Sequence, residues 1–232
     1  MTLSIKSVFA VPLECEACVA DVSKALQTVP GIERYDVNLA DQLVSVEGEV
    51  APSSVVSSIR STGRDAIVRG SGEPNSAAVC ILETHDPKFR ASPIRGLARM
   101  VKASASTTLL DLTLDGMPPN SKFYASIRTS GNISNGALSA GEKFMGLGTI
   151  DSDDQGVGQS FLLKEGLSIT DIIGRSVVVG SDLEGKALHS EDVVGVIARS
   201  AGAWQNDKTV CSCSGKTVWQ ERKDAIQKGL RT

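Results

Sequence analysis

The 232-residue sequence is poor in aromatic residues, at 4%, and has two histidines and little excess charge, with 24 basic and 27 acidic side chains. This balance argues against nucleic acid or another polyanion as a partner. No continuous apolar run approaches the roughly 18 residues of a membrane helix, so we expect no stable membrane insertion. The N-terminus also lacks the parts of a secretory signal. We therefore expect folded domains in the cytosol.

The five cysteines are distributed unevenly along the chain. Cys15 and Cys18 form one close pair, Cys211 and Cys213 form another, and Cys80 stands alone in an apolar run. In a reducing compartment such pairs indicate metal or redox chemistry rather than structural disulfides. Cys80 is expected to be a small buried side chain.

Residues 1–70 are predicted to form a small α+β domain. A strand over 5–11 precedes a helix over 17–28, and alternating apolar residues between 35 and 46 indicate a hairpin. Pro52 fits the first turn of a second helix, which a short strand over 66–68 follows. The order βαββαβ is that of a ferredoxin-like fold.

The rest of the chain is predicted to form a second domain and a tail, so the protein is multidomain. Residues 71–75 are rich in glycine and proline and read as a linker. Residues 76–204 carry short alternating runs between glycine-rich turns, with no helical pattern, typical of an antiparallel Greek-key β-sandwich or barrel. Residues 205–232 are too few to build a core. We expect a short flexible tail, helical near its end, that orders on a partner or on the sandwich.

The first cysteine pair lies where a strand passes into a helix. The free N–H groups at a helix start favour thiolates, and two soft thiolates suit copper(I). A structural zinc ion needs four ligands, and no other Cys or His lies in this segment. The alternatives are a chance spacing and a thioredoxin-like redox pair.

The context of this pair resembles a known family. Cys15-Glu-Ala-Cys18 at the opening of a βαββαβ unit is similar to the heavy-metal-associated domain, whose signature is Met-x-Cys-x-x-Cys. Leu13 occupies the methionine position, which retains apolar character while departing from the pattern.

The middle segment resembles Cu/Zn superoxide dismutase. The stretches 123–144, 174–179 and 195–197 are similar to three regions of that enzyme. Together with the second cysteine pair, they make the chain similar to the copper chaperones for superoxide dismutase, especially the fungal form.

Carried over position by position, the resemblance implies that the dismutase metal site is erased, zinc included. The positions of the histidine ligands hold Ser126, Arg128, Lys143 and Gly180, and the enzyme's two disulfide positions hold Ala137 and Val194. His85 and His189 match no ligand position. We expect no dismutase activity.

A barrel that keeps the shape of a dismutase can present its two-fold surface and form a heterodimer with a dismutase subunit, or a homodimer. The resemblance assigns this interface to Gly195, Val196, Ile197, Arg199 and Trp204. A tryptophan at such a position is also common in a core. The alternative is that the domain serves only as a spacer.

The second pair, Cys211-Ser-Cys213, has one intervening residue. A disulfide across it closes a strained, oxidising ring, and the reduced pair offers two thiolates to copper(I). The resemblance implies that this tail transfers copper or oxidises the target's thiols, and allows a fraction in the mitochondrial intermembrane space. A thiol-disulfide oxidoreductase with incidental copper and a non-catalytic scaffold for dismutase assembly remain alternative functions.

Overall fold

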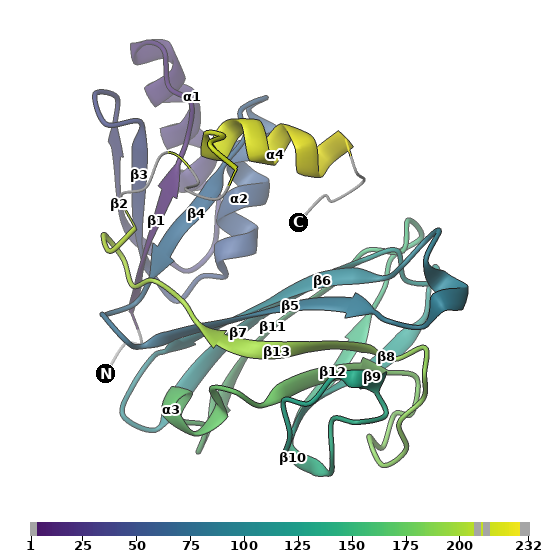
Figure 1. The fold of residues 1–232 in the computed structure, drawn as a ribbon. Coiled ribbons are helices and arrows are strands. Elements are labelled where there is room, and N and C mark those ends of the chain that lie inside the picture. Colours follow the sequence, from purple (N-terminus) through teal and green to yellow (C-terminus); the bar gives the residue numbers. More distant parts are fainter. Residues whose placement is uncertain (1–3, 207–209, 211–213, 228–232) are drawn as a thin grey trace.

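The computed structural model describes residues 4–206, 210 and 214–227. Figure 1 shows a small α/β domain, a larger β-barrel beneath it, and a separate helix near the C-terminal end of the chain. No helix among these residues is long and apolar enough to cross a membrane.

The first domain has the predicted βαββαβ order. Its elements are β1 (Ile5–Ala10), α1 (Glu16–Gln27), β2 (Ile32–Asn38), β3 (Leu43–Gly48), α2 (Pro52–Ser61) and β4 (Ile67–Ser71). The sheet has the strand order β2-β3-β1-β4. Apolar side chains of the helices and the sheet form one core that includes Phe9, Leu26, Val44 and Ile59. The ferredoxin-like prediction is confirmed.

The last strand of this domain is longer than predicted. Gly70 and Ser71 belong to β4, because they pair with Val8 and Ser7 of β1. A bulge in β4 accompanies this pairing, because Arg69 is the extra residue between Gly70, opposite Val8, and Val68, opposite Phe9. The strand prediction over 66–68 therefore ended too early, and β4 continues into the stretch that the glycines made look like a linker.

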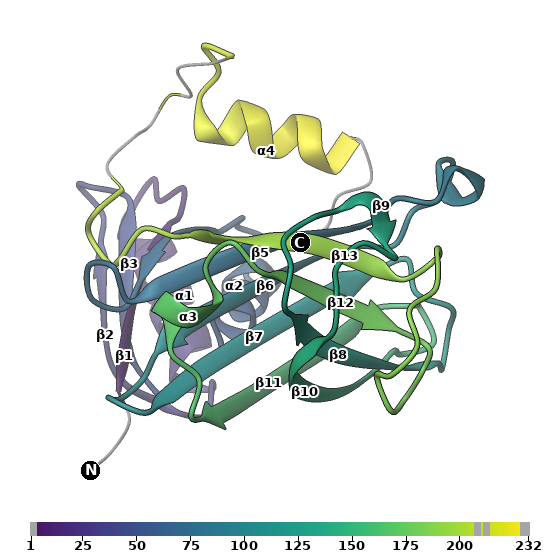
Figure 2. The same ribbon diagram turned by 60° about the horizontal axis from the view of Figure 1, so that its bottom comes forward.

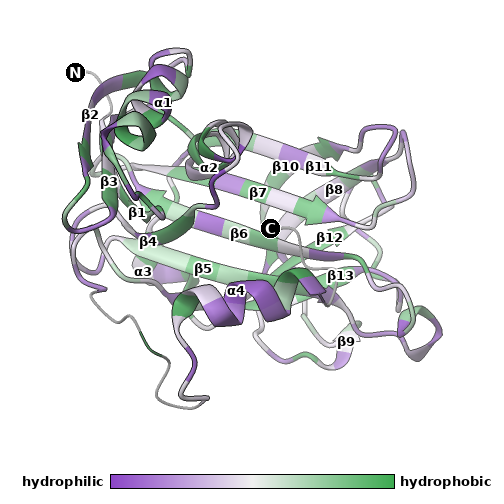
Figure 3. Cartoon of the chain, turned by 90° about the horizontal axis from the view of Figure 1, so that it is seen from above, coloured by the Kyte–Doolittle hydropathy of each residue, from purple (hydrophilic) through white to green (hydrophobic). Residues whose placement is uncertain are grey.

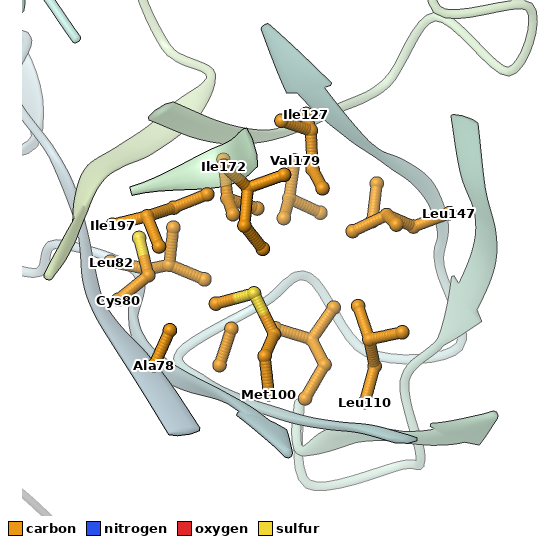
Figure 4. Close-up of a cluster of buried hydrophobic side chains, with 14 of the residues drawn as sticks. Ala78, Cys80, Leu82, Met100, Leu110, Ile127, Leu147, Ile172, Val179 and Ile197 are labelled. Carbon is orange, nitrogen blue, oxygen red and sulfur yellow. The ribbon is translucent and has the colours of Figure 1, made fainter. Parts of the chain in front are cut away.

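The barrel is an eight-stranded antiparallel sheet with a ninth short strand beside it. Its elements are β5 (Ala77–Thr84), β6 (Arg95–Lys102), β7 (Thr107–Asp115), β8 (Lys122–Arg128), β9 (Ser134–Ala137), β10 (Lys143–Asp151), β11 (Gly158–Glu165), β12 (Ser176–Gly180) and β13 (Val193–Arg199). The order is β10-β8-β12-β13-β5-β6-β7-β11. The β10–β11 hairpin brings the two edge strands together (Figure 2). Apolar side chains from opposite walls meet inside (Figure 4).

Strands β9, β10 and β11 were not predicted. β10 contains Gly146 and Gly148 and its register shifts twice against β8, so a strict alternation is lost. β11 is largely half-buried or exposed along its length. Two short helical turns, Pro87–Phe89 and α3 (Ile169–Ile172), interrupt the loops without changing the all-β character of the domain.

The first domain and the barrel contact each other through hydrogen bonds and close backbone packing. The Asp111 carboxylate of β7 accepts hydrogen bonds from the backbone N–H of Ser53 at 2.9 Å and from its hydroxyl at 2.5 Å. Ser53 lies in the first turn of α2, where free N–H groups and the helix dipole favour an anion. A Cβ on Gly70 would lie 2.0 Å from the carbonyl oxygen of Gly202, so backbone meets backbone there. These contacts fix the first domain against the barrel.

The tail helix α4 (Val218–Gln227) contacts the first domain. Arg222 forms an ion pair with Asp65 at 2.9 Å, and Asp65 forms a second ion pair with Arg60, also at 2.9 Å. Upstream, the guanidinium of Arg69 donates to the carbonyl oxygen of Asn206. Figures 1 and 3 place α4 on the same side of the barrel as α2. We expected the tail to order on the sandwich or on a partner. The contacts described here are with the first domain instead, so that prediction is wrong for them.

Candidate metal centre

Cys15 and Cys18 lie at the start of α1, as predicted. Cys15 is the exposed N-cap residue, with extended backbone, and Cys18 is buried in the first turn. Their sulfur atoms are 3.5 Å apart. Leu13, only 1% exposed, anchors the preceding loop in the core, and Gln42 donates to its carbonyl oxygen at 3.2 Å. The leucine thus supplies the apolar anchor predicted for the methionine position.

The pKa of Cys18 is lowered to about 7, first by the backbone at Glu14 and then by the side chains of Arg64 and Cys15. Arg64 is positioned by Asp21 at 3.2 Å and by the carbonyl oxygen of Thr62 at 3.1 Å. A lowered pKa increases the thiolate fraction, which is the form that binds metal. The two sulfur atoms, with the Arg64 guanidinium beside Cys18, form a site whose soft ligands suit a soft cation.

Sequence reasoning missed Arg64, although its position followed from the topology. β1 and β4 are antiparallel neighbours, and Ala10 at the end of β1 pairs with Ile67 at the start of β4. The loop that leaves β1 and the loop that enters β4 therefore meet at one end of the sheet. A basic residue directly after Gly63, where α2 has ended, was the available signal.

Cys211 and Cys213 lie outside the described residues. Next to them, Val210 and Thr217 form an isolated antiparallel bridge. Ser214 donates to the Glu221 carboxylate at 2.5 Å, and Lys216 pairs with Asp224 in α4. Cys80 is fully buried in the barrel, and burial raises the pKa of its thiol to about 12, in agreement with a packing role.

The four positions carried over from the dismutase ligands lie on neighbouring strands of the barrel. Ser126 and Arg128 are buried in β8, Lys143 pairs in register with Arg128, and Gly180 ends β12. Arg128 donates to the carbonyl oxygen of Gly185 at 3.2 Å. A Cβ on Gly180 would lie 2.4 Å from Oδ1 of Asp192, so this carboxylate occupies the space of a side chain there.

Burial shifts both charged groups in this region toward neutrality. It lowers the pKa of the Arg128 guanidinium and raises the pKa of the Asp192 carboxyl, while each group partly offsets the shift of the other. The disulfide positions are also apolar: Ala137 and Val194 are buried in one small cluster with Ala140 and Val178. Buried apolar side chains thus occupy the two disulfide positions, and the oppositely charged Arg128 and Asp192 lie at the ligand positions.

The predicted docking residues lie in different environments. Val196 is 37% exposed, whereas Ile197 is 1% exposed and belongs to the barrel core. Gly195 is buried against β5, so closely that a Cβ there would lie 1.8 Å from the carbonyl oxygen of Ile81. Trp204 is 56% exposed rather than part of a core, and it lies 5.8 Å from the Lys6 ammonium of the first domain. Arg199, near the end of β13, is exposed as well. Val196 is therefore the exposed member of the Gly195–Ile197 stretch, whereas Trp204 faces the first domain.

Two further exposed residues and a half-buried arginine lie on the same side of the barrel and were not predicted as interface residues. Ile81 on the adjacent strand is 74% exposed, and Phe144 is 40% exposed. Arg175 stacks on the Phe144 ring at 4.1 Å, and its carbonyl oxygen accepts from the N–H of Ile197. We call Ile81, Phe144, Arg175 and Val196 the outer patch. Phe144 lies at the start of β10, a strand that the sequence did not predict, and Arg175 directly precedes β12.

Comparisons with known proteins agree with the fold and the cysteine pair. The model of the heavy-metal-associated domain family matches residues 8–65. A superoxide dismutase 1 copper chaperone of Debaryomyces hansenii is 50% identical over the whole length of both chains. That of Saccharomyces cerevisiae is 40% identical over 97% of each chain. A copper chaperone for superoxide dismutase from Mus musculus is 31% identical over 92% of this chain and 88% of its own.

Proposed function

Since the chain belongs to the copper chaperones for superoxide dismutase, which deliver copper to that enzyme, we propose that it carries copper as copper(I) on Cys15 and Cys18. The observation that carries this proposal is the pair of sulfur atoms 3.5 Å apart at a helix start. Copper(I) prefers few soft ligands, which two thiolates provide. The chain is a chaperone and not itself a dismutase.

Charge balance supports the singly charged ion. Two thiolates and one copper(I) carry a net charge of minus one, and the Arg64 guanidinium beside Cys18, which also pairs with Asp21, partly offsets it. The cargo therefore adds little unbalanced charge to a site at the protein surface. The arginine is also held by Asp21, so it remains in place as the ion arrives or leaves.

Copper(I) competition tests this assignment. The full chain with Cys15→Ser and Cys18→Ser should lose the tight copper(I) site in titrations against a chromophoric chelator, leaving only the capacity of Cys211 and Cys213. Cys80→Ala removes a thiol as well and is the matched control, because Cys80 is buried in the barrel. Unchanged copper affinity and stoichiometry in the double variant would contradict the proposal.

We further propose that the outer patch docks a Cu/Zn superoxide dismutase subunit in a heterodimer, and that the same surface allows a homodimer. Two-fold interfaces are self-complementary, so a barrel of this shape can replace one subunit. Ile81 and Val196 supply exposed apolar area on adjacent strands, and Phe144 with Arg175 supplies an aromatic and a cation. Aromatic residues and arginine are enriched at protein–protein interfaces, and exposed aliphatic side chains gain from burial there.

A charge placed in the patch tests docking. Val196→Asp in the full chain should abolish co-elution with copper-free dismutase at micromolar concentration. Phe161→Asp changes an equally exposed residue on β11 and should leave the complex intact. Equal co-elution of both variants would show that the barrel docks elsewhere or serves as a spacer.

For the tail, we propose that Cys211 and Cys213 act on the docked enzyme, receiving copper or exchanging a disulfide. In the exchange, one target thiolate attacks the tail disulfide, a mixed disulfide forms, and the second target thiol resolves it. Two electrons move from the target to the tail, which ends as a dithiol. With Cys213→Ser, Cys211 has no partner for closure, so oxidation should trap an adduct with a target cysteine, seen by non-reducing electrophoresis.

We place this activity in the cytosol, with a fraction in the mitochondrial intermembrane space. Cys15 and Cys18 bind copper only as reduced thiols, which the cytosol maintains.

A further inference from the structure

A cavity of about 460 Å³ lies between the first domain, the barrel and the tail. Helix α2 and strand β4 form one wall, and the outer face of β5, β6 and β7 forms another. Asn206 and Arg222 of the tail close it at the side. Figure 3 shows α2 and α4 above this face of the barrel. Its volume is in the range of small-ligand sites, and domain junctions are a common place for them.

The walls of this cavity are rich in guanidinium groups. The arginines among its described lining residues are Arg60, Arg69, Arg99, Arg199 and Arg222. One carboxylate, Asp115, lines it with them. Adding the two partners outside the lining, Asp65 and Asp111, leaves five positive against three negative groups, an excess of two. This concentration of cations is unusual in a chain with a net charge of -3.

Among these arginines, Arg69 gives the clearest indication that the cavity binds an anion. It is 8% exposed, and its Nε and Nη2 both donate to the carbonyl oxygen of Asn206, at 3.0 and 2.7 Å. Within the described part of the chain it forms no ion pair. A buried cation with a neutral acceptor is costly unless an anion joins it. Arg199 likewise forms no ion pair within that part of the chain and lies on the same cavity.

Arg99 and Arg222 complete the arrangement from two further directions. Arg99, on the barrel face, lies 3.6 Å from the buried Asp111, and burial lowers the pKa of its guanidinium. Arg222, from the tail, is held by Asp65. Guanidinium groups keep their charge in such settings and bind carboxylate and phosphate oxygens in pairs.

We propose that this cavity binds a small anion carrying at least two carboxylate or phosphate groups, with Arg69 and Arg199 as its principal contacts. The ligand would contact the first domain through Arg69, the barrel through Arg199 and the tail through Arg222. Its binding therefore stabilises the docked arrangement of the tail. The proposal is independent of copper, since the cavity contains no cysteine among its described lining residues.

Calorimetric titration of the full chain with sodium pyrophosphate and, separately, with sodium citrate tests the proposal and distinguishes phosphate from carboxylate ligands. We expect submillimolar binding of at least one probe at 0.1 M sodium chloride. Arg199→Gln should weaken it about ten-fold, the loss of one charge-assisted contact of about 1.4 kcal/mol. Arg34→Gln is the matched control, because Arg34 is exposed and lies on β2.

Hydrogen exchange supplies a second measurement on the same protein. The bound probe should slow amide exchange in residues 67–71 and 218–227 of the wild type, and Arg199→Gln should reduce that protection. Arg199 lies on the barrel, so this variant leaves the fold of the first domain intact. Absence of binding by both probes, or equal affinities of wild type and Arg199→Gln, would overturn the proposal.

Discussion

The first domain and the barrel differ in how they hold the positions that the two resemblances assign to metal ligands. In the first domain the thiols lie in a loop and at a helix start, with Arg64 beside them. Cys15 is exposed, whereas Cys18 packs at the edge of a core to which the loop contributes Val11 and Leu13. In the barrel the corresponding positions lie inside strands, and Arg128 and Asp192 now fill the space. A site in a loop is kept or lost with little effect on packing. At positions inside a barrel, every side chain has to fit its packed neighbours.

The strongest test of this difference is to return a ligand-type side chain to the barrel. Gly180→His should destabilise the protein by about 3 kcal/mol, since its Cβ would meet the Asp192 carboxylate at 2.4 Å in a packed interior. Urea unfolding measures the loss. Adding Asp192→Ala should recover part of it, and a fully stable Gly180→His variant would show that the position is not filled.

A smaller effect is expected at the junction of the two domains. Asp111→Asn keeps the shape but removes the charge that caps α2 and pairs with Arg99, so the free energy of unfolding should fall by about 2 kcal/mol. Ser53→Ala, which removes one of the hydrogen bonds, should cost about 1 kcal/mol. Equal stability of wild type and Asp111→Asn would mean that the domains are not coupled there.

The charge on the metal site can be tested through pH. The pKa of Cys18 is lowered to about 7 from 9.0, so its thiolate, and the stability gained from it, is present above the higher value and is lost as pH falls through 7. Alkylation of Cys18, followed by peptide mass mapping, should show a midpoint near pH 7. Arg64→Ala should move the midpoint upward and weaken copper binding at neutral pH by about ten-fold. An unchanged midpoint would remove Arg64 from the site.

The smallest expected effect concerns the tail. Arg222→Gln breaks a partly exposed ion pair with Asp65, so global stability should change by less than about 1 kcal/mol. Proteolysis near the α4 segment should nevertheless become faster, because the helix loses its ion pair with the first domain. Lys223→Gln alters the neighbouring residue of α4 and serves as the control. Identical digestion of the two variants would mean that α4 is held by other contacts.

The same contrast explains what the sequence could predict. Val22, Leu26, Val44 and Val46 lie at regular spacings, so the βαββαβ order and the place of Cys15 at a helix start were predicted correctly. β10 was missed because its glycines and bulges disturb the alternation. Arg222 and Asp65 are 157 residues apart, and no periodic pattern connects them. Local periodicity predicts helices and strands, whereas an ion pair between distant segments is known only once the three-dimensional fold is known.

The two contacts of the tail with the first domain have a kinetic consequence. Asn206 is held by Arg69 and Arg222 by Asp65, so the segment between them, which contains the second cysteine pair in the sequence, is attached at both ends to the domain that carries the first pair. Short tethers of this kind give effective concentrations on the order of millimolar. A copper ion passing between the two pairs would therefore move within one molecule, in a first-order step whose rate does not depend on how much chaperone the cell contains.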